Sequence, residues 1–235
     1  MCHRCDLSEL LLITTILPFS CPKVSSLKRI GPHNYDILSI IIGSLLGDAT
    51  MEKDGYGSRF AFYQAKINGE YLLWLHQIIS LLGYSKENIP LIQSIKGIDG
   101  QLRYYYRFRT YTYSSFNWIY DEFYPSSSLL GKGVRKIVPK SIENFLSPLA
   151  LAIWLMDDGC KYKNKGLKFS TNGFTLKDVK VLASVLENKY GLITAIHKTG
   201  IVNQYSLYIP KSNLKELIKI VKPHIHPTMA YKIEN

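Results

Sequence analysis

The chain has 235 residues, of which 46% are hydrophobic and 20% charged, so it can bury a substantial core and does not have the composition of a disordered chain. Lys and Arg total 29 against 18 Asp and Glu, and the resulting net charge of +11 favours a polyanionic partner. A membrane surface also attracts basic proteins, but neither a basic amphipathic helix nor a long apolar span stands out. We therefore expect a nucleic-acid partner and no membrane.

Cysteine usage points to a reducing compartment. The spacing is not that of a disulfide framework, and no second pair follows the first at a spacing typical of zinc ligands, so neither a disulfide scaffold nor a zinc site is expected. The four cysteines are Cys2, Cys5, Cys21 and Cys160.

The N-terminal residues 1–33 are treated as an appendage. Their apolar run, residues 8–21, is too short to span a bilayer, which needs about 20 residues. Asp6 and Glu9 dilute the positive charge that a secretory signal carries, and Arg4 is the only basic residue before Lys23, which argues against a mitochondrial presequence. Disorder, processing and packing on the surface stay open for this segment.

The rest of the chain contains one pattern twice. Each copy opens with a helix-length apolar run that ends in an acid: ILSIIIGSLLGDA (37–49) and PLALAIWLMDDG (148–159). Apolar periodicity then predicts, in both copies, two strands, a helix, two strands and a closing helix. Three of the four strands are located in each copy, at 59–64, 91–97 and 102–112 in the first and at 165–171, 192–198 and 204–210 in the second. The helices are expected at 68–84 and 114–124, and at 174–191 and 212–222.

This order predicts an α+β fold of two αββαββα halves, residues 34–124 and 148–235, joined by a Pro- and Ser-marked linker, 125–147. Thr175 and Asp178 form a capping box that should open the helix at 174–191. The two opening helices are too apolar for a solvated face. They should pack on each other about a pseudo-two-fold axis, with Gly43, Ser44 and Ala152 allowing close contact.

Such packing would bring Asp48 and Asp158 together at one end of the helix pair. Neighbouring buried carboxylates repel unless a cation neutralises them, and oxygen ligands of this kind suit Mg²⁺. Magnesium bound to paired acids is common machinery for hydrolysing phosphodiesters. Asp157 has no counterpart, because Gly47 occupies its place, so its side chain is expected to play a supporting or structural role.

Polar and basic side chains alternate along the strands, which predicts a nucleic-acid surface on one face of each sheet and apolar side chains on the other. Protective charge on an edge strand is the alternative. Tyr104, Tyr106 and Phe108 should face an aromatic core. The outward set is Arg59, Tyr63, Arg103, Tyr105, Arg107 and Arg109 in the first half, and Lys168, Ser170, Asn172, Gln204, Ser206 and Tyr208 in the second.

The segments IIGSLLGDA (41–49) and LAIWLMDDG (151–159) resemble the two signature helices of single-chain LAGLIDADG homing endonucleases, with Asp48 and Asp158 at the eighth position of each. The resemblance extends from Tyr35 to Lys232. The segments at 134–159 and 226–233 are similar to the yeast mitochondrial intron-encoded endonuclease of this family. The first motif departs from the strict pattern at Gly47 and Ala49, but its acid is intact.

The resemblance implies a saddle of two antiparallel sheets on the major groove of a long, asymmetric double-stranded DNA site. It implies Mg²⁺ at Asp48 and Asp158, with Mn²⁺ or Ca²⁺ as substitutes, and the main-chain carbonyls of Gly47 and Asp157 in the metal shell. Lys136 and Lys232 match the two basic residues beside the metals and occupy equivalent places in the repeat; surface lysines are the alternative. Both DNA strands would be cut, leaving short 3′ overhangs.

The family further implies a monomeric, intron-encoded enzyme of mitochondrion or chloroplast. An RNA maturase that helps its host intron to splice, with that intron's RNA as partner, is the main alternative. A DNA-binding regulator with an inactive site is a third reading. Two intact acids favour the nuclease over both, because neither RNA binding nor DNA binding requires them.

Overall fold

The computed structural model describes residues 24–125, 135–162 and 165–234. These form two compact units. The first contains the described residues up to Gly31 together with Met51–Phe116, and the second contains Pro32–Thr50 and the described residues from Asn117 on. Among the described residues, no helix has both the length and the apolar character that crossing a membrane requires.

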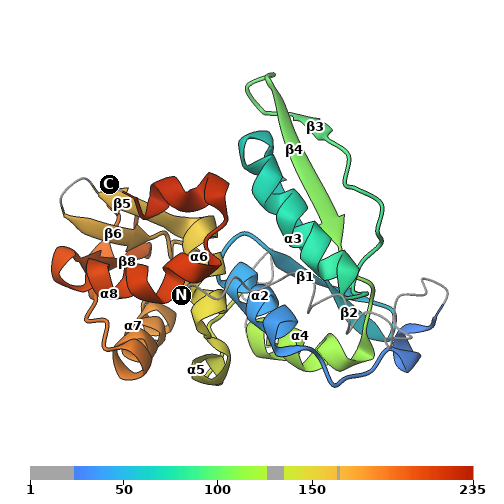
Figure 1. Cartoon of the computed structure of the whole chain (residues 1–235), viewed down its shortest axis with the longest axis horizontal. Helices are drawn as coiled ribbons and strands as arrows, with labels where there is room; N and C mark the ends of the chain where they lie inside the picture. Colours follow the sequence, from blue (N-terminus) through green and yellow to red (C-terminus); the bar gives the residue numbers. More distant parts are fainter. Residues whose placement is uncertain (1–23, 126–134, 163–164, 235) are drawn as a thin grey trace, which may run out of the picture. The chain divides into compact units, whose positions relative to one another are not determined.

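The first unit is a four-stranded antiparallel sheet with a helix packed on it. The sheet contains β1 (Thr50–Asp54, whose first residue belongs to the second unit), β2 (Gly57–Ala65), β3 (Gln93–Lys96) and β4 (Leu102–Arg109) in the order β1-β2-β4-β3. Helix α3 (Gly69–Leu81) packs against β2 and β4, as Figure 1 shows in teal and green. Short 3₁₀ turns are η2 (Ser26–Lys28), η3 (Lys66–Asn68) and η4 (Ser114–Phe116).

Apolar side chains of the strands meet those of α3 to form the core of this unit. Phe62 stacks on Phe108 with ring centroids 4.7 Å apart, and Tyr71 and Leu72 on α3 are fully buried. The predicted aromatic core is correct for Phe108 but wrong for Tyr104, whose side chain is 48% exposed. Tyr104 lies near the turn of the β3–β4 hairpin.

The second unit holds the other sheet and most of the helices. Its strands are β5 (Gly159–Tyr162), β6 (Gly166–Phe169), β7 (Ala195–Lys198) and β8 (Tyr205–Pro210), in the order β5-β6-β8-β7. Helices α7 (Leu176–Tyr190) and α8 (Lys211–Val221) pack against this sheet (Figure 1). The remaining helices are α2 (Tyr35–Leu46), α4 (Asn117–Phe123), α5 (Ile142–Phe145), α6 (Pro148–Asp158), η6 (Lys222–His224) and η7 (Pro227–Lys232).

The element order confirms the predicted repeat of helix, two strands, helix, two strands and helix in an α+β fold. The capping box of α7 is present, with Thr175 Oγ1 accepting from the Asp178 amide at 3.2 Å and Asp178 Oδ2 accepting from the Thr175 amide at 2.9 Å. Gly191 ends α7 in the left-handed conformation, with φ of 65°, which glycine adopts without a steric penalty.

Helices α2 and α6 pack directly on each other within the second unit, as predicted from their apolar sequences. An ideal Cβ added to Gly43 would lie 2.4 Å from the carbonyl oxygen of Ala150 and 2.8 Å from Cβ of Ile153, so only glycine permits this approach. Ser39 on α2 and Ser147, the N-cap of α6, share a buried hydrogen bond of 2.7 Å. Backbone contact between α2 and α6 therefore fixes the distance between the ends of the two helices.

Replacing Gly43 by Ala is expected to lower the free energy of unfolding, because the added methyl group meets rigid backbone in a packed interface, and overpacking of this kind costs ~1–3 kcal/mol or more. Helix propensity alone would act in the opposite direction, by about 1 kcal/mol. Denaturant unfolding measures the net sign. Gly173→Ala is the matched control, since an added Cβ there points into open space. Equal stability of the Gly43 variant and the wild type would contradict the close packing.

Candidate metal site and nucleic-acid interface

Asp48 and Asp158 stand at the same end of the α2–α6 pair. Helix α2 ends at Leu46 because Gly47 leaves the helical region, with φ −102° and ψ −127°, and Asp48 follows it. Asp158 is the last residue of α6. The backbone amide of Asp48 lies 3.4 Å from Oδ2 of Asp157, which joins the two helix ends directly. The structure thus brings together the two acids that the sequence singled out.

The two motifs differ at the position before the acid, and their packing explains why. A Cβ on Gly47 would lie 2.5 Å from Cβ of Asp157, so the Asp157 side chain occupies the space that a side chain at position 47 would need. Asp157 therefore reaches across the interface, and Gly47 leaves room for it. This agrees with the structural role expected for the Asp157 side chain.

Each helix end also binds one lysine, Lys136 half-buried at α2 and Lys232 buried at α6. Lys136 Nζ donates to the carbonyl oxygens of Leu45, Gly47 and Ala49 at 2.8, 2.9 and 3.0 Å. Lys232, 9% exposed, is placed equivalently on α6: its Nζ donates to the carbonyl of Met156 and, at 3.0 Å, to that of Asp157.

Cations at these positions complement the partial negative charge of the helix C-termini. Lys232 is buried and Lys136 half-buried, so neither side chain has the full exposure that the surface-lysine alternative implies. Sequence reasoning did not foresee that they bind the carbonyls at the ends of the signature helices.

The ionisable side chains at this end of the helix pair strongly affect one another's pKa values. Burial, reinforced by the charge of Asp48, raises the pKa of Asp158 to about 7, while Lys136 and Lys232 act in the opposite direction. Burial likewise lowers the pKa of both lysines, and the nearby aspartates oppose that shift. Without a further cation, Asp158 therefore keeps its proton to a higher pH than an ordinary carboxyl does.

The donor set fits a hard divalent cation. It combines two carboxylates with the main-chain carbonyls of Gly47 and Asp157, each of which keeps a lone pair beside its lysine hydrogen bond. Within the described part of the chain, no group of three or more His, Cys, Asp and Glu residues could hold a metal. An ion here would complete its shell with water or phosphate oxygens, a pattern typical of Mg²⁺ rather than of structural zinc.

We predict that the metal-free wild type loses stability relative to Asp158→Asn as pH rises from about 4 to about 7. A carboxyl whose pKa is raised in the folded state stabilises the protein below its unfolded pKa, and this contribution is lost as pH rises through the folded pKa. Each pKa unit corresponds to about 1.4 kcal/mol, so the difference should reach a few kcal/mol.

Denaturant unfolding with a chelator, at several pH values, measures this difference. Burial of His33 lowers its pKa to about 4 and so raises stability with pH over part of the same range, but His33 is present in both proteins and cancels. A pH-independent difference between the two proteins would refute the half-buried position of Asp158 beside Asp48.

In the first unit, the predicted face carries its arginines as expected. The register pairs Ala61 with Arg109 and Tyr63 with Arg107, which places both arginines beside β2 on the face of Tyr63. Tyr63 and Tyr105 lie with ring centroids 4.7 Å apart, and Arg103 pairs with Asp99 at 3.0 Å. Sequence reasoning missed the acids among these residues, Glu52 and Asp54 on β1.

In the second unit, the predicted face is only partly accessible. Lys168 and Tyr208 are half-buried partners in the register of β6 and β8, and Lys168 Nζ lies 5.4 Å from the Tyr162 ring centroid. Ser206 is only 4% exposed, which contradicts its predicted contact with nucleic acid; its hydroxyl donates to the carbonyl of His197 at 3.5 Å. Of the rest, Ser170 and Gln204 are half-buried, and Asn172 is exposed.

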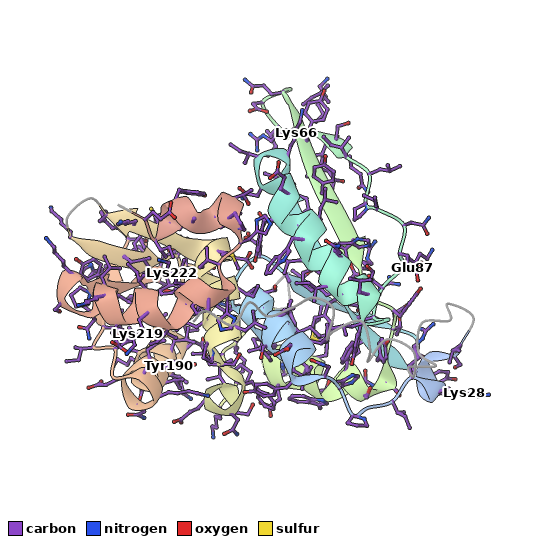
Figure 2. All side chains as sticks on the ribbon, viewed as in Figure 1. Lys28, Lys66, Glu87, Tyr190, Lys219 and Lys222 are labelled. Carbon is purple, nitrogen blue, oxygen red and sulfur yellow. The ribbon has the colours of Figure 1, made fainter. Side chains whose placement is uncertain are left out.

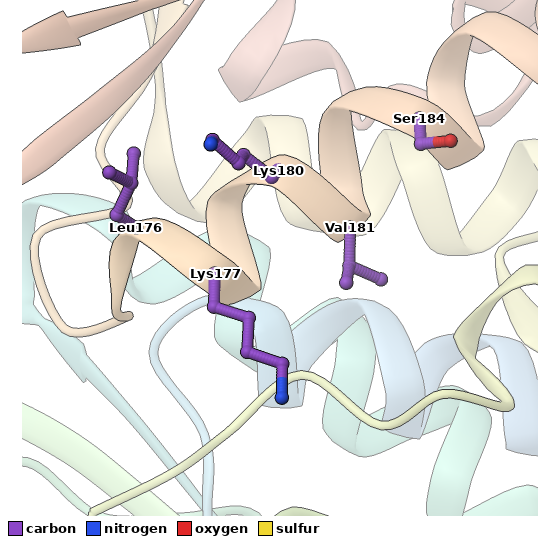
Figure 3. Close-up of a pocket in the computed structure, with 5 residues that line it drawn as sticks. All are labelled: Leu176, Lys177, Lys180, Val181 and Ser184. Carbon is purple, nitrogen blue, oxygen red and sulfur yellow. The ribbon is translucent and has the colours of Figure 1, made fainter.

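Each unit has a surface hollow, and these two hollows have different lining residues. One of about 490 Å³ lies along α7 and is lined by residues of that helix alone, which Figure 3 shows as Leu176, Lys177, Lys180, Val181 and Ser184. It contains no acid or nucleophile in a reactive setting, so it is not the candidate site. Another, of about 510 Å³ in the first unit, is lined in part by Arg59, Arg107 and Arg109.

The profile of the LAGLIDADG DNA endonuclease family matches residues 38–217, so the chain belongs to this family. The cytochrome b mRNA maturase bI2 of Saccharomyces cerevisiae is 49% identical over 211 residues, which are 88% of this chain and 49% of that protein. The chain thus spans about half the length of this relative.

Two further likenesses are of different kinds. The intron-encoded endonuclease ai4 of Dictyostelium discoideum is 37% identical over 68% of this chain and 98% of its own length. The solved structure of the homing endonuclease I-WcaI bound to its DNA recognition sequence superposes with a TM-score of 0.72 at 22% identity, covering 100% of this chain and 95% of that one. The latter likeness shows the fold.

Proposed function

We propose that the protein is a site-specific homing endonuclease that hydrolyses both strands of a long, asymmetric double-stranded DNA target with Mg²⁺, leaving short 3′ overhangs. It acts as a monomer and is encoded in an intron of an organelle. The observation that carries the proposal is the pair Asp48 and Asp158, held at one end of two packed helices with a carbonyl-bound lysine beside each. A solvated helix end needs no such arrangement.

Each residue has a distinct part in this chemistry. Asp48 and Asp158 would hold divalent metal, which when bound supplies an activated water and stabilises charge on the phosphate. Lys136 and Lys232 fix the carbonyls that precede these acids and place positive charge where negative charge develops in the transition state. The Asp157 side chain holds the two helix ends in register.

Family membership supports the nuclease class, and the name of the intron-encoded relative from Dictyostelium discoideum supports the intron-encoded origin. The basic strand faces supply contacts to DNA: Arg59, Arg107 and Arg109 in the first unit, and Lys168 and Tyr208 in the second. Guanidinium groups bind either phosphate oxygens or guanine in the major groove.

A second function has its own support. Relatives at 49% and 44% identity, from Saccharomyces cerevisiae and Debaryomyces hansenii, are named cytochrome b mRNA maturases. We propose maturase activity as the alternative, with the host intron's RNA as partner. It requires binding of RNA but no cleavage of DNA, so the two functions separate experimentally.

Asp48→Asn and Asp158→Asn are each expected to slow DNA cleavage by ~10²–10³-fold or more while binding is retained, because each removes a charge that metal and phosphate need. Cleavage of intronless alleles of candidate host genes in Mg²⁺, read on a gel, provides the measurement. Asp121→Asn, an exposed acid on α4, is the control.

The result distinguishes the nuclease from the maturase. Loss of DNA cleavage with retained DNA binding supports the nuclease. Intact DNA after incubation with folded wild-type protein and Mg²⁺, together with promotion of intron splicing by that protein, would leave the maturase as the sole function.

A further inference from the structure

Three arginines of the first unit converge on a single carboxylate. Glu52, on β1, accepts from Arg59 Nε at 3.0 Å, from Arg107 Nη2 at 2.8 Å, and from Arg109 through both Nε at 3.0 Å and Nη2 at 3.2 Å. Four hydrogen bonds from three guanidinium groups to one side chain are more than a protective surface ion pair needs. This set, Glu52 with Arg59, Arg107 and Arg109, is called the arginine cluster below.

A second acid fixes the outer side of the same cluster. Asp54, two residues further along β1, accepts from Arg59 Nη1 at 2.9 Å and from the Thr112 hydroxyl at 2.7 Å. Arg59 is therefore held at two points by two acids of one strand. Its guanidinium plane is fixed rather than free to rotate about a flexible stem.

Strand pairing explains how one carboxylate reaches three arginines. Arg109 stands opposite Ala61 and Arg107 opposite Tyr63, while Arg59 precedes Ala61 by two residues and so points to the same face. The arginines thus occupy neighbouring positions on β2 and β4. Like charges at such spacing repel, and Glu52 offsets that repulsion from the adjacent strand.

The cluster is partly open to solvent. The side chains of Glu52, Arg59, Arg107 and Arg109 are 29%, 31%, 34% and 39% exposed. The hollow of about 510 Å³ opens at this point. A guanidinium carries five N–H donors, so each arginine keeps donors beyond those directed at the acids.

Burial raises the pKa of Glu52, but hydrogen bonds from Arg109 and Arg59 outweigh it and hold that pKa below its usual value. Glu52 is therefore a charged group on a surface proposed to bind a polyanion. A negative charge here weakens general attraction to phosphates, so its benefit has to come from geometry.

We propose that Glu52 is a positioning residue for DNA recognition: it holds three arginines at fixed spacing, so that selectivity for the target rises while non-specific attraction falls. The proposal rests on the proposed DNA-binding function. Arginines fixed in this way bind a particular arrangement of bases and phosphates without first losing conformational entropy, whereas free arginines adapt to any duplex.

Two substitutions separate charge from geometry. Glu52→Gln removes the charge, so binding to a mixed-sequence duplex should tighten and its salt dependence should steepen by up to about one released ion. Binding to the selected target should weaken relative to that duplex, by about 10-fold or more. Glu52→Asp keeps the charge but shortens the reach, so it should lose selectivity without gaining non-specific affinity.

The experiment uses the full chain without divalent metal, so that no DNA is cut. Duplexes bound by wild-type protein are first selected from a randomised library, and the affinities of each variant for the selected and mixed-sequence duplexes are then measured. Glu87→Gln is the matched control. It makes the same charge change at an exposed position of the same unit, outside the arginine cluster (Figure 2).

The expected result is a drop in selectivity for both Glu52 variants, with base preference lost over several adjacent positions of the library, and none for Glu87→Gln. If Glu52→Gln increased the affinity for both duplexes equally, the proposal would be overturned, and Glu52 would act only as a charge that repels DNA. Loss of preference at one base pair would also overturn it, in favour of direct contact. Absence of any DNA binding by wild type would instead refute the proposed function.

Discussion

The close approach of α2 and α6 is the constraint on which the rest of the second unit depends. Gly43 lets one helix backbone lie against the other, where an added methyl group would collide with the carbonyl of Ala150. Because both helices are buried around most of their circumference, neither can slide without exposing apolar surface. The ends of the two helices are consequently fixed, and the side chains at those ends are positioned as rigidly as the packed core.

Paired acids in such a place create an electrostatic problem that the fold only partly solves. Lys136 and Lys232 lie beside the carboxylates, yet their hydrogen bonds are directed at main-chain carbonyls of the helix ends. Asp158 therefore keeps a raised pKa despite two neighbouring cations. A bound divalent cation would relieve the remaining imbalance and would connect stability of this end of the molecule to the proposed catalysis.

The sequence predicted the repeat, the helix pair and the convergence of Asp48 and Asp158, because apolar periodicity is local and an acid at matching ends of two buried helices is rare by chance. It could not predict the partners of the arginines. The β1 sequence TMEKD contains both acidic and basic residues. Only the register of three strands decides which of these side chains meets Arg107 and Arg109. Ser206 shows the same limit. Period-two alternation predicts on which face of the sheet a side chain lies, but it does not predict how far neighbouring residues bury that side chain.

A crystal of the protein grown with DNA and Mn²⁺ would test the central claim most directly, through the anomalous scattering of the ion. The account predicts a peak between the carboxylates of Asp48 and Asp158, within coordination distance of both, that disappears in the double asparagine variant. Manganese bound elsewhere, or carboxylates too far apart to share an ion, would contradict it.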